Sequence, residues 1–152
     1  MKELVNITEC QIDDMTGEEL GFLLQSLIDH PGVLDAYYTA VQMKKNRPGN
    51  LLTVMSLTKN TEAIENFILL NSSTFGVRTS SVERRILDRE FIQNQTDWGV
   101  LNMKVGKYEG IVVKITPEYE DVVKISQKSG RPFFEVFQWA KKLAAKLKEK
   151  NQ

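Results

Sequence analysis

Hydrophobic residues recur with two different periods along the first half of the chain, which predicts a mixture of strands and helices. Residues 4–10 predict a strand that has Val5 and Ile7 on one face. A capping box, Thr16-Gly17-Glu18-Glu19, predicts the start of a helix, and His30-Pro31-Gly32 predicts its end. Between these signals the apolar residues follow helical spacing: Leu20, Leu23, Leu24, Leu27 and Ile28.

A hairpin and a second helix are predicted next. Residues 33–43 favour a strand because they are rich in Val, Tyr and Thr. A polar turn follows at residues 44–50, and a returning strand at 51–57. A second helix is capped by Asn60 or Thr61, and its apolar set is Ala63, Ile64, Phe67, Ile68 and Leu70. A long strand then runs from residue 77 towards 93. This β-α-β-β-α-β order predicts a ferredoxin-like unit over about residues 4–90.

The rest of the chain predicts an antiparallel ribbon and two helices. Strands near 100–105 and 111–116 are joined by a glycine-containing turn. Pro117 opens one helix that Gly130 closes, and Pro132 opens the last. We therefore predict an α+β fold in a single domain, residues 1–152. The β-ribbon and C-terminal helices occupy about residues 91–149, with a weak seam near residue 90.

The predicted topology places three polar loops at one edge of the sheet. These are the loops at residues 11–17, 44–50 and 71–76, and they are the least apolar stretches of the first half. Four strands spaced about 4.8 Å apart separate the two outer loops by roughly 15 Å. That distance is about the length of an extended nucleotide.

Composition excludes several classes of site. The 152 residues include one cysteine and one histidine, so a disulfide framework or a cysteine- or histidine-rich metal site within one copy is excluded. We expect Cys10, at a strand end, to be buried and inert. The 20 basic and 20 acidic residues balance, which argues against nucleic-acid binding. Without a membrane span or a signal region, the sequence predicts a cytoplasmic protein.

The charge is unevenly distributed along the chain. Residues 1–43 hold eight acidic residues and one basic residue, whereas residues 44–152 hold 19 basic and 12 acidic residues. An acidic and a basic segment in one domain can hold a cation beside an anion. They can equally complement each other on the surface.

Two of the polar loops carry candidate phosphate-binding residues. The turn offers Lys44, Lys45, Asn46 and Arg47, and the positive charges of its two lysines and its arginine suit phosphate oxygens. The loop after the second helix offers hydroxyl and backbone N–H groups, with a guanidinium nearby, from Ser72, Ser73, Thr74 and Arg78. The alternatives are a solvated hairpin tip and a helix stop made of small polar residues.

Asp13 and Asp14 are the candidate metal-binding residues in the third loop. Two adjacent carboxylates beside a phosphate site repel the ligand unless a cation lies between them, and Mg²⁺ or Mn²⁺ favours such oxygen ligands. The alternative is that both only complement the dipole of the following helix.

Four motifs resemble those of the nickel-insertion protein family called LarC. The segment from Glu9 to Glu18 resembles E-x-N-I-D-D-M-x-x-E, although Gln11 stands where the family often has Asn. Met43 to Gly49 is similar to M-K-K-x-R-P-G, Ser73 to Arg78 to S-T-x-G-V-R, and Pro117 to Asp121 to P-E-Y-E-D. The motifs occur in the same order as in the C-terminal part of that family.

The resemblance implies a function in cofactor synthesis. The family inserts nickel into pyridinium-3,5-bisthiocarboxylic acid mononucleotide, which gives the nickel-pincer nucleotide of lactate racemase, in a reaction that requires CTP and Mn²⁺ or Mg²⁺. It also implies an N-terminal region as a partner, which we expect to handle most of the nickel and without which we expect this chain to be inactive. The resemblance leaves the catalytic residues unknown.

The sequence leaves two other functions as alternatives. A non-catalytic module that binds a ligand, forms a homo-oligomer and regulates or assembles a partner is compatible with the same loops. An RNA-binding sheet is disfavoured by the zero net charge and by the lack of its aromatic motif.

Overall fold

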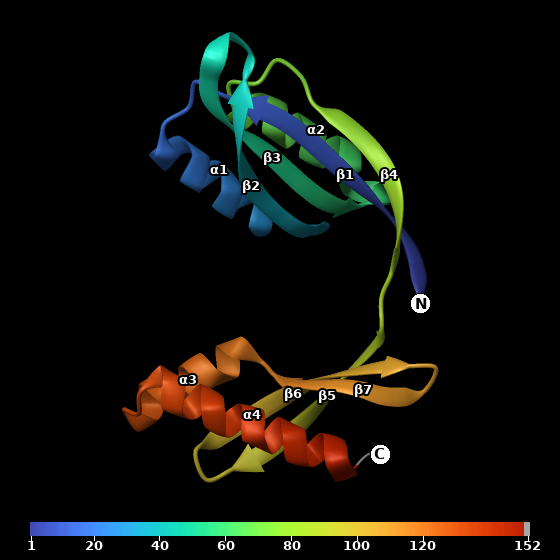
Figure 1. The fold of residues 1–152 in the computed structure, drawn as a ribbon, viewed down its shortest axis with the longest axis vertical. Coiled ribbons are helices and arrows are strands. Elements are labelled where there is room, and N and C mark those ends of the chain that lie inside the picture. Colours follow the sequence, from blue (N-terminus) through green and yellow to red (C-terminus); the bar gives the residue numbers. More distant parts are fainter. Residues whose placement is uncertain (151–152) are drawn as a thin grey trace. The chain divides into compact units, whose positions relative to one another are not determined.

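The computed structural model describes residues 1–150, which form two compact units (Figure 1). Lys2–Arg85 make the first unit, and the residues from Ile86 onward, together with Met1, make the second. Each unit has its own cluster of buried apolar side chains. The division falls close to residue 90, where the sequence predicts a seam. That the whole chain folds as one domain stays a prediction.

The first unit is a four-stranded antiparallel sheet with two helices. Its strands lie in the order β2-β3-β1-β4. The elements are β1 (Lys2–Ile12), α1 (Gly17–Ile28), β2 (Val33–Met43), η1 (Lys44–Asn46), β3 (Arg47–Leu57), η2 (Thr58–Asn60), α2 (Thr61–Asn71) and β4 (Arg78–Arg85). This strand order is that of the ferredoxin-like fold, so the predicted α+β fold class is confirmed.

Both helices of the first unit pack on the same face of the sheet. The fully buried residues of α1 are Leu23 and Leu27, and those of α2 are Ile64 and Ile68. They meet the strand residues Cys10, Ile12, Ala36, Leu52 and Val54 in one core. Burying each large aliphatic side chain contributes about 1.5–3 kcal/mol, so this core holds the sheet end in place for the loops above it.

The second unit is a three-stranded antiparallel sheet covered by two helices. Its strands are β5 (Asp88–Thr96), β6 (Gly99–Tyr108) and β7 (Ile111–Pro117), in that order across the sheet. The helices are α3 (Tyr119–Ser129) and α4 (Phe133–Lys150). Apolar side chains from every second position of β6, Leu101, Met103 and Val105, are fully buried against Val122 and Val136 of the helices.

The predicted long strand from residue 77 towards 93 is wrong in one respect, because the chain leaves the first sheet at Ile86 and Leu87. The residues before this break pair with β1, and those after it pair with β6. Leu87 packs beside Gly106 of β6, where an added Cβ would come within 2.9 Å of the Leu87 side chain. The break therefore depends on contacts far apart in the sequence.

Several element ends also differ from the prediction. β3 begins at Arg47, so the connection to β2 is the single short turn η1 and not the whole of residues 44–50. Asn60 occupies the N-cap position of α2 without a capping bond from its side chain. Pro117 ends β7, and α3 begins at Tyr119. Gly130 closes α3 as predicted, with a left-handed φ of 68°.

No helix within residues 1–150 combines the length and the hydrophobicity needed to cross a membrane.

Candidate functional site

One end of the first sheet gathers the three polar loops. β1 and β2 both finish at this end, and β3 and β4 begin there, because neighbouring strands in this sheet are antiparallel. The register pairs Ile12 with Asn50 and Met43 with Arg47, and Glu9 with Arg78. The predicted arrangement of the loops is therefore present.

The hairpin between β2 and β3 is tight. Lys45 and Asn46 both have a left-handed φ of 59°, which asparagine tolerates better than lysine. The Asn46 side-chain oxygen accepts a 3.0 Å hydrogen bond from Nε2 of Gln42, which holds the turn against its own strand. Lys44 and Lys45 form no ion pair within residues 1–150, so both ammonium groups are free to meet an anion.

A pocket of about 570 Å³ lies where the hairpin, the end of β1 and the loop before β4 meet. Three of the predicted phosphate-binding residues line it: Lys44, Thr74 and Arg78. The other lining residues are Glu9, Cys10, Gln11, Gln42, Met43, Phe75, Gly76 and Val77. The pocket thus joins residues from two of the three predicted loops to the end of β1.

Glu9 is a pocket residue that the sequence analysis did not select. Its carboxylate accepts a 3.2 Å hydrogen bond from Nε of Arg78 and a 3.3 Å bond from the hydroxyl of Thr53. The acid therefore orients the guanidinium of Arg78 at the edge of the pocket. A signal for it would have been the pairing of Glu9 with Arg78, but that register depends on where β4 begins.

Cys10 is only 2% exposed, as the sequence predicts for a strand-end cysteine. Burial raises the pKa of its thiol, while a hydrogen bond with Thr74 and the positive charge of Arg78 partly oppose that rise. The thiolate is the reactive form, so a buried thiol with a raised pKa is a poor nucleophile near neutral pH.

Asp14 and Ser73 lie in a second hollow, of about 580 Å³, beside the N-terminus of α1. The hydroxyl of Ser73 donates a hydrogen bond to the Asp14 carboxylate, which ties the loop after α2 to the loop after β1. Ser72 also lines this hollow, and its hydroxyl donates a 2.7 Å bond to the carbonyl of Ile68. Ser72 and Ser73 thus line a different hollow from Thr74, although the Thr74 backbone N–H donates a 3.4 Å bond to the Ser72 hydroxyl.

Asp13 turns towards the hairpin. Its carboxylate lies 3.2 Å from Nη1 of Arg47 and is 19% exposed, whereas the arginine side chain is 55% exposed. The two adjacent carboxylates are therefore held by different loops, Asp13 by the hairpin and Asp14 by the loop after α2. Asp13 and Arg47 connect the hollow of Asp14 to the hairpin that borders the first pocket.

These carboxylates fit a hard cation only in part. Within residues 1–150 no group of three His, Cys, Asp or Glu side chains is placed to hold a metal ion. Mg²⁺ is commonly held by one or two carboxylates together with substrate phosphates and water. Asp13 and Asp14 fit that role, in which a bound anion supplies the remaining oxygens, and do not form a metal cage by themselves.

Comparisons with known proteins point to one family. The family model described as "Nickel insertion protein" matches residues 1–137. A pyridinium-3,5-bisthiocarboxylic acid mononucleotide nickel insertion protein of Staphylococcus saprophyticus is 41% identical over 133 residues, which cover 88% of this chain and 34% of that protein. A protein of the same name from Geobacillus kaustophilus is 40% identical over 136 residues, covering 90% of this chain and 33% of that protein.

A solved structure supports the same conclusion. LarC2, the C-terminal domain of a cyclometallase involved in the synthesis of the NPN cofactor of lactate racemase, in its apo form, superposes with a TM-score of 0.86 at 34% identity. The match covers 96% of this chain and 99% of that domain. A protein from Methanopyrus kandleri, 24% identical with a TM-score of 0.67 over 95% of this chain and 90% of that protein, shares the fold.

The chain spans about a third of the length of the curated relatives it matches. Its extent is that of the C-terminal domain named in the solved relative. The family model covers most of the chain, and both curated relatives match nearly all of it. The chain therefore belongs to the nickel insertion protein family.

Proposed function

We propose that this chain is the domain that binds CTP with Mn²⁺ or Mg²⁺ in an enzyme that inserts nickel into pyridinium-3,5-bisthiocarboxylic acid mononucleotide. The product is the nickel-pincer nucleotide. The observation that carries the proposal is the pocket at the sheet end, where Lys44 and Thr74 from two loops meet Arg78 at the start of β4. Its volume of about 570 Å³ is within the usual range for a small-ligand site.

The site would accept a triphosphate by letting phosphate oxygens replace the carboxylate partners of two arginines. Arg47 and Arg78 are neutralised by Asp13 and Glu9 in the structure, through pairs whose arginines are more than half exposed. Exposed ion pairs of this kind contribute at most about 1 kcal/mol, so phosphate oxygens can compete for the guanidinium groups. Lys44 adds a point charge at the same pocket.

The proposed metal site follows from the same replacement of carboxylate by phosphate. When phosphate takes Arg47, the carboxylate of Asp13 loses its partner and lies beside the new negative charge. Asp13 and Asp14 would then hold the divalent ion or its water molecules, while the ion neutralises the phosphate oxygens. Ser73 would keep Asp14 oriented through its existing hydrogen bond.

Nickel itself is a substrate in this proposal, and its handling is assigned mainly to the N-terminal region. Nickel favours imidazole and thiolate ligands. The chain has one of each, and they do not belong to a metal cluster within residues 1–150. Cys10 lines the pocket, whereas His30 follows α1, with its Nδ1 3.0 Å from the carbonyl oxygen of Pro31. The isolated chain is therefore proposed to bind CTP without completing nickel insertion.

A module that binds CTP without cleaving it is the second candidate. It is favoured by the burial and the raised pKa of the Cys10 thiol, which make this pocket residue a poor nucleophile. Release of cytidine monophosphate or diphosphate by the longer protein, but not by this chain, would support this second role for the chain. A cytoplasmic location stays a prediction.

Calorimetric titration with CTP and Mn²⁺ tests the assignment of the arginines. We expect Arg47→Ala and Arg78→Ala each to weaken binding by about tenfold or more, because a hydrogen bond to a charged group contributes about 1.5–3 kcal/mol. Arg85→Ala is the matched control, since this exposed arginine lies at the opposite end of β4. Equal affinities for all three variants and the unchanged chain would contradict the phosphate assignment.

A further inference from the structure

The second sheet carries helices on one face only. On β6 the side chains of Leu101, Met103 and Val105 point to α3 and α4 and are fully buried in the core of this unit. Because successive side chains of a strand alternate between its two faces, the residues between them point the other way. We call this other side the uncovered face, and it includes Leu87 and Arg89, Phe91, Lys104, Gly106 and Lys114.

The strand register places these residues in two neighbouring rows. In one row Arg89 lies opposite Gly106, which lies opposite Lys114. In the next row Phe91 lies opposite Lys104. Neighbouring strands lie about 4.8 Å apart and residues two positions apart on a strand about 6.6 Å apart, so the Cα atoms of the three cations lie within roughly 12 Å of that of Phe91. The ring and the three basic side chains therefore belong to one patch.

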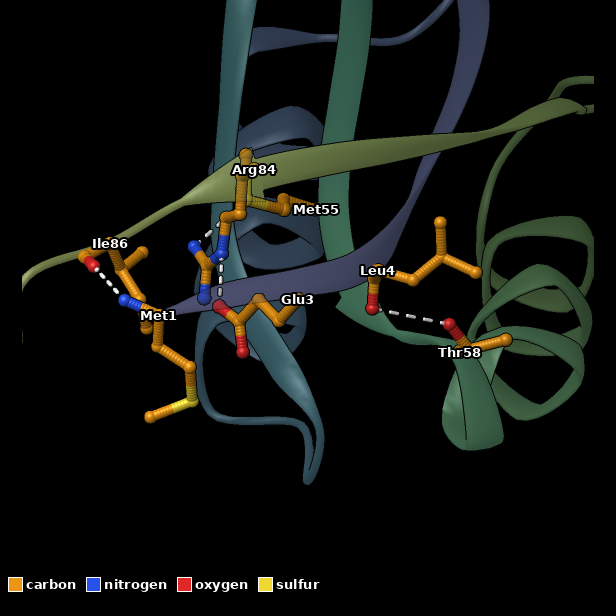
Figure 2. A network of polar contacts seen from close by, with 7 residues as sticks. All are labelled: Met1, Glu3, Leu4, Met55, Thr58, Arg84 and Ile86. Atoms are coloured by element: carbon orange, nitrogen blue, oxygen red, sulfur yellow. Dashed lines mark hydrogen bonds and ion pairs between the residues drawn. The ribbon is translucent and has the colours of Figure 1, made fainter.

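The middle of the first row is apolar. Gly106 has no side chain, and Leu87 lies over it, since an added Cβ would come within 2.9 Å of the Leu87 Cδ1 atom. Figure 2 shows Met1 beside Ile86, the residue before Leu87. The Met1 nitrogen donates a 2.8 Å bond to the carbonyl of Ile86, and the Ile86 N–H donates a 2.9 Å bond to the carbonyl of Met1. These bonds hold the chain where it brings Leu87 onto the uncovered face.

The ring and two of the three cations are open to a ligand. Phe91 is 62% exposed, and Arg89 and Lys114 are exposed as well. Neither of these two cations forms an ion pair with any group among residues 1–150. Lys104 is paired, with its Nζ 3.0 Å from the Glu118 carboxylate. The patch therefore has a net positive charge, although the whole chain is neutral.

An exposed aromatic ring among cations suits a planar ligand that carries several negative charges. Aromatic ligands stack on a phenyl ring, and a ring that is itself cationic gains more from the negative face of the phenyl group. Arginine offers a fork to carboxylate or phosphate, and lysine offers a point charge. A pyridinium ring that bears acidic substituents combines these features in one molecule.

We propose that the uncovered face binds the pyridinium mononucleotide, with the pyridinium ring on Phe91 and the acidic groups at Arg89, Lys104 and Lys114. This inference rests on the proposed function, which names that mononucleotide as the substrate. Two thiocarboxylates and one phosphate give three acidic groups for three cations.

The uncovered face would hold the mononucleotide and not the nickel. The one cysteine and the one histidine of the chain both lie in the first unit, so the face offers neither of the ligands that nickel favours. The nickel insertion step itself is thereby left to the other regions of the longer protein. CTP stays assigned to the pocket of the first unit.

Saturation-transfer NMR of the whole 152-residue chain with nicotinic acid mononucleotide tests the binding. This probe has the pyridinium ring, one carboxylate and the phosphate. We expect saturation of its ring protons, and we expect Phe91→Ala to weaken binding by about fivefold or more, as loss of a stacking ring does, whereas Phe91→Tyr keeps it. Phe134→Ala is the matched control, because Phe134 is 71% exposed on α4 of the same unit.

Charge reversal tests the anion contacts. Arg89→Glu and Lys114→Glu are each expected to weaken binding of the probe by about tenfold, because a like charge replaces a partner of the acidic groups. Lys142→Glu is the control, since this exposed lysine lies on α4, which covers the opposite face of the sheet. Circular dichroism checks that each variant has folded, and Arg89→Gln and Lys114→Gln replace a variant that has not.

Three results would overturn the proposal. The first is no transfer to the probe, or equal transfer in Phe91→Ala and the unchanged chain. The second is loss of probe binding in Arg47→Ala or Arg78→Ala, which would place the probe in the pocket of the first unit. The third is a response to a single-stranded oligonucleotide and none to the mononucleotide. We expect Phe91→Ala to bind CTP as the unchanged chain does, so a failure of CTP binding with probe binding intact would contradict the assignment of CTP alone.

Discussion

Single side chains at the end of the first sheet are held in exchangeable pairs. Asp13 contacts Arg47 across the hairpin, and Asp14 accepts a bond from Ser73. Each pair joins residues that are distant in the sequence. The proposal gives Asp13 two partners in turn, the guanidinium of Arg47 in the free chain and the divalent ion once phosphate has bound.

Replacing Asp13 separates these two roles. Asp13→Asn removes the competitor of phosphate at Arg47 and also a ligand of the metal. We expect CTP to bind the variant with equal or higher affinity when no metal is present, and the gain in affinity from Mn²⁺ to fall by about tenfold. Calorimetric titrations with and without Mn²⁺ measure both effects.

Asp35→Asn provides the matched control, because Asp35 is an exposed aspartate on β2 outside both hollows. It should leave both affinities as in the unchanged chain. A full Mn²⁺ effect in Asp13→Asn would contradict a role for Asp13 at the metal and would leave it as a structural partner of Arg47.

At the scale of elements, local signals predicted helices better than strand ends. The capping box of α1 is present as predicted: the Glu19 backbone N–H donates to the Thr16 hydroxyl, and the Thr16 N–H donates to the Glu19 carboxylate. All its atoms lie within one turn, so the sequence contains the whole interaction. The break at Leu87 and the start of β3 at Arg47 depend on partners across the sheets, which the local pattern does not contain.

The capping box makes a prediction about stability. Thr16→Ala is expected to lower the free energy of unfolding by about 1 kcal/mol, as loss of an N-cap hydroxyl usually does. Urea titration measures the change, with Thr116→Ala on an exposed position of β7 as the control. A loss no larger than that of the control would contradict the importance of the cap.

The same box gives this effect a pH dependence. Hydrogen bonds from Thr16 lower the pKa of the Glu19 carboxyl. Because the folded pKa lies below the unfolded one, the stabilisation is present above the unfolded value, near pH 4.3, and is lost as the pH falls through the folded value. The backbone N–H of Thr16 is the larger cause and is retained in Thr16→Ala, so Glu19→Gln is the variant to compare. The difference in the free energy of unfolding between Glu19→Gln and the unchanged chain should shrink in acid.

The candidate site depends on contacts that the sequence pattern alone does not predict. The topology predicts that three loops meet at one end of the sheet, because chain direction alone decides this. It does not predict that Thr74 and Ser73, adjacent in the sequence, line different hollows. That separation depends on side-chain directions, since the Ser73 hydroxyl donates to Asp14 and the Thr74 hydroxyl donates a 2.9 Å bond to the carbonyl of Gly76. Glu9 was missed for the same reason, since its role depends on its partners in β3 and β4.

At the scale of the whole molecule, the pocket and the core that supports it belong to the first unit. The chain spans about a third of the length of its curated relatives, which contain further regions outside the matched part. A domain with a nucleotide pocket at one sheet end would supply the longer enzyme with its nucleotide site. In this account nickel chemistry takes place elsewhere in the longer protein.

The most direct measurement is calorimetric titration of the purified chain with CTP, ATP and GTP, each with and without Mn²⁺. We expect CTP to bind, to bind more tightly than ATP and GTP, and to bind more tightly still with Mn²⁺. The absence of heat with all three nucleotides in the presence of Mn²⁺ would contradict the proposal that this chain itself holds the nucleotide of the nickel insertion reaction.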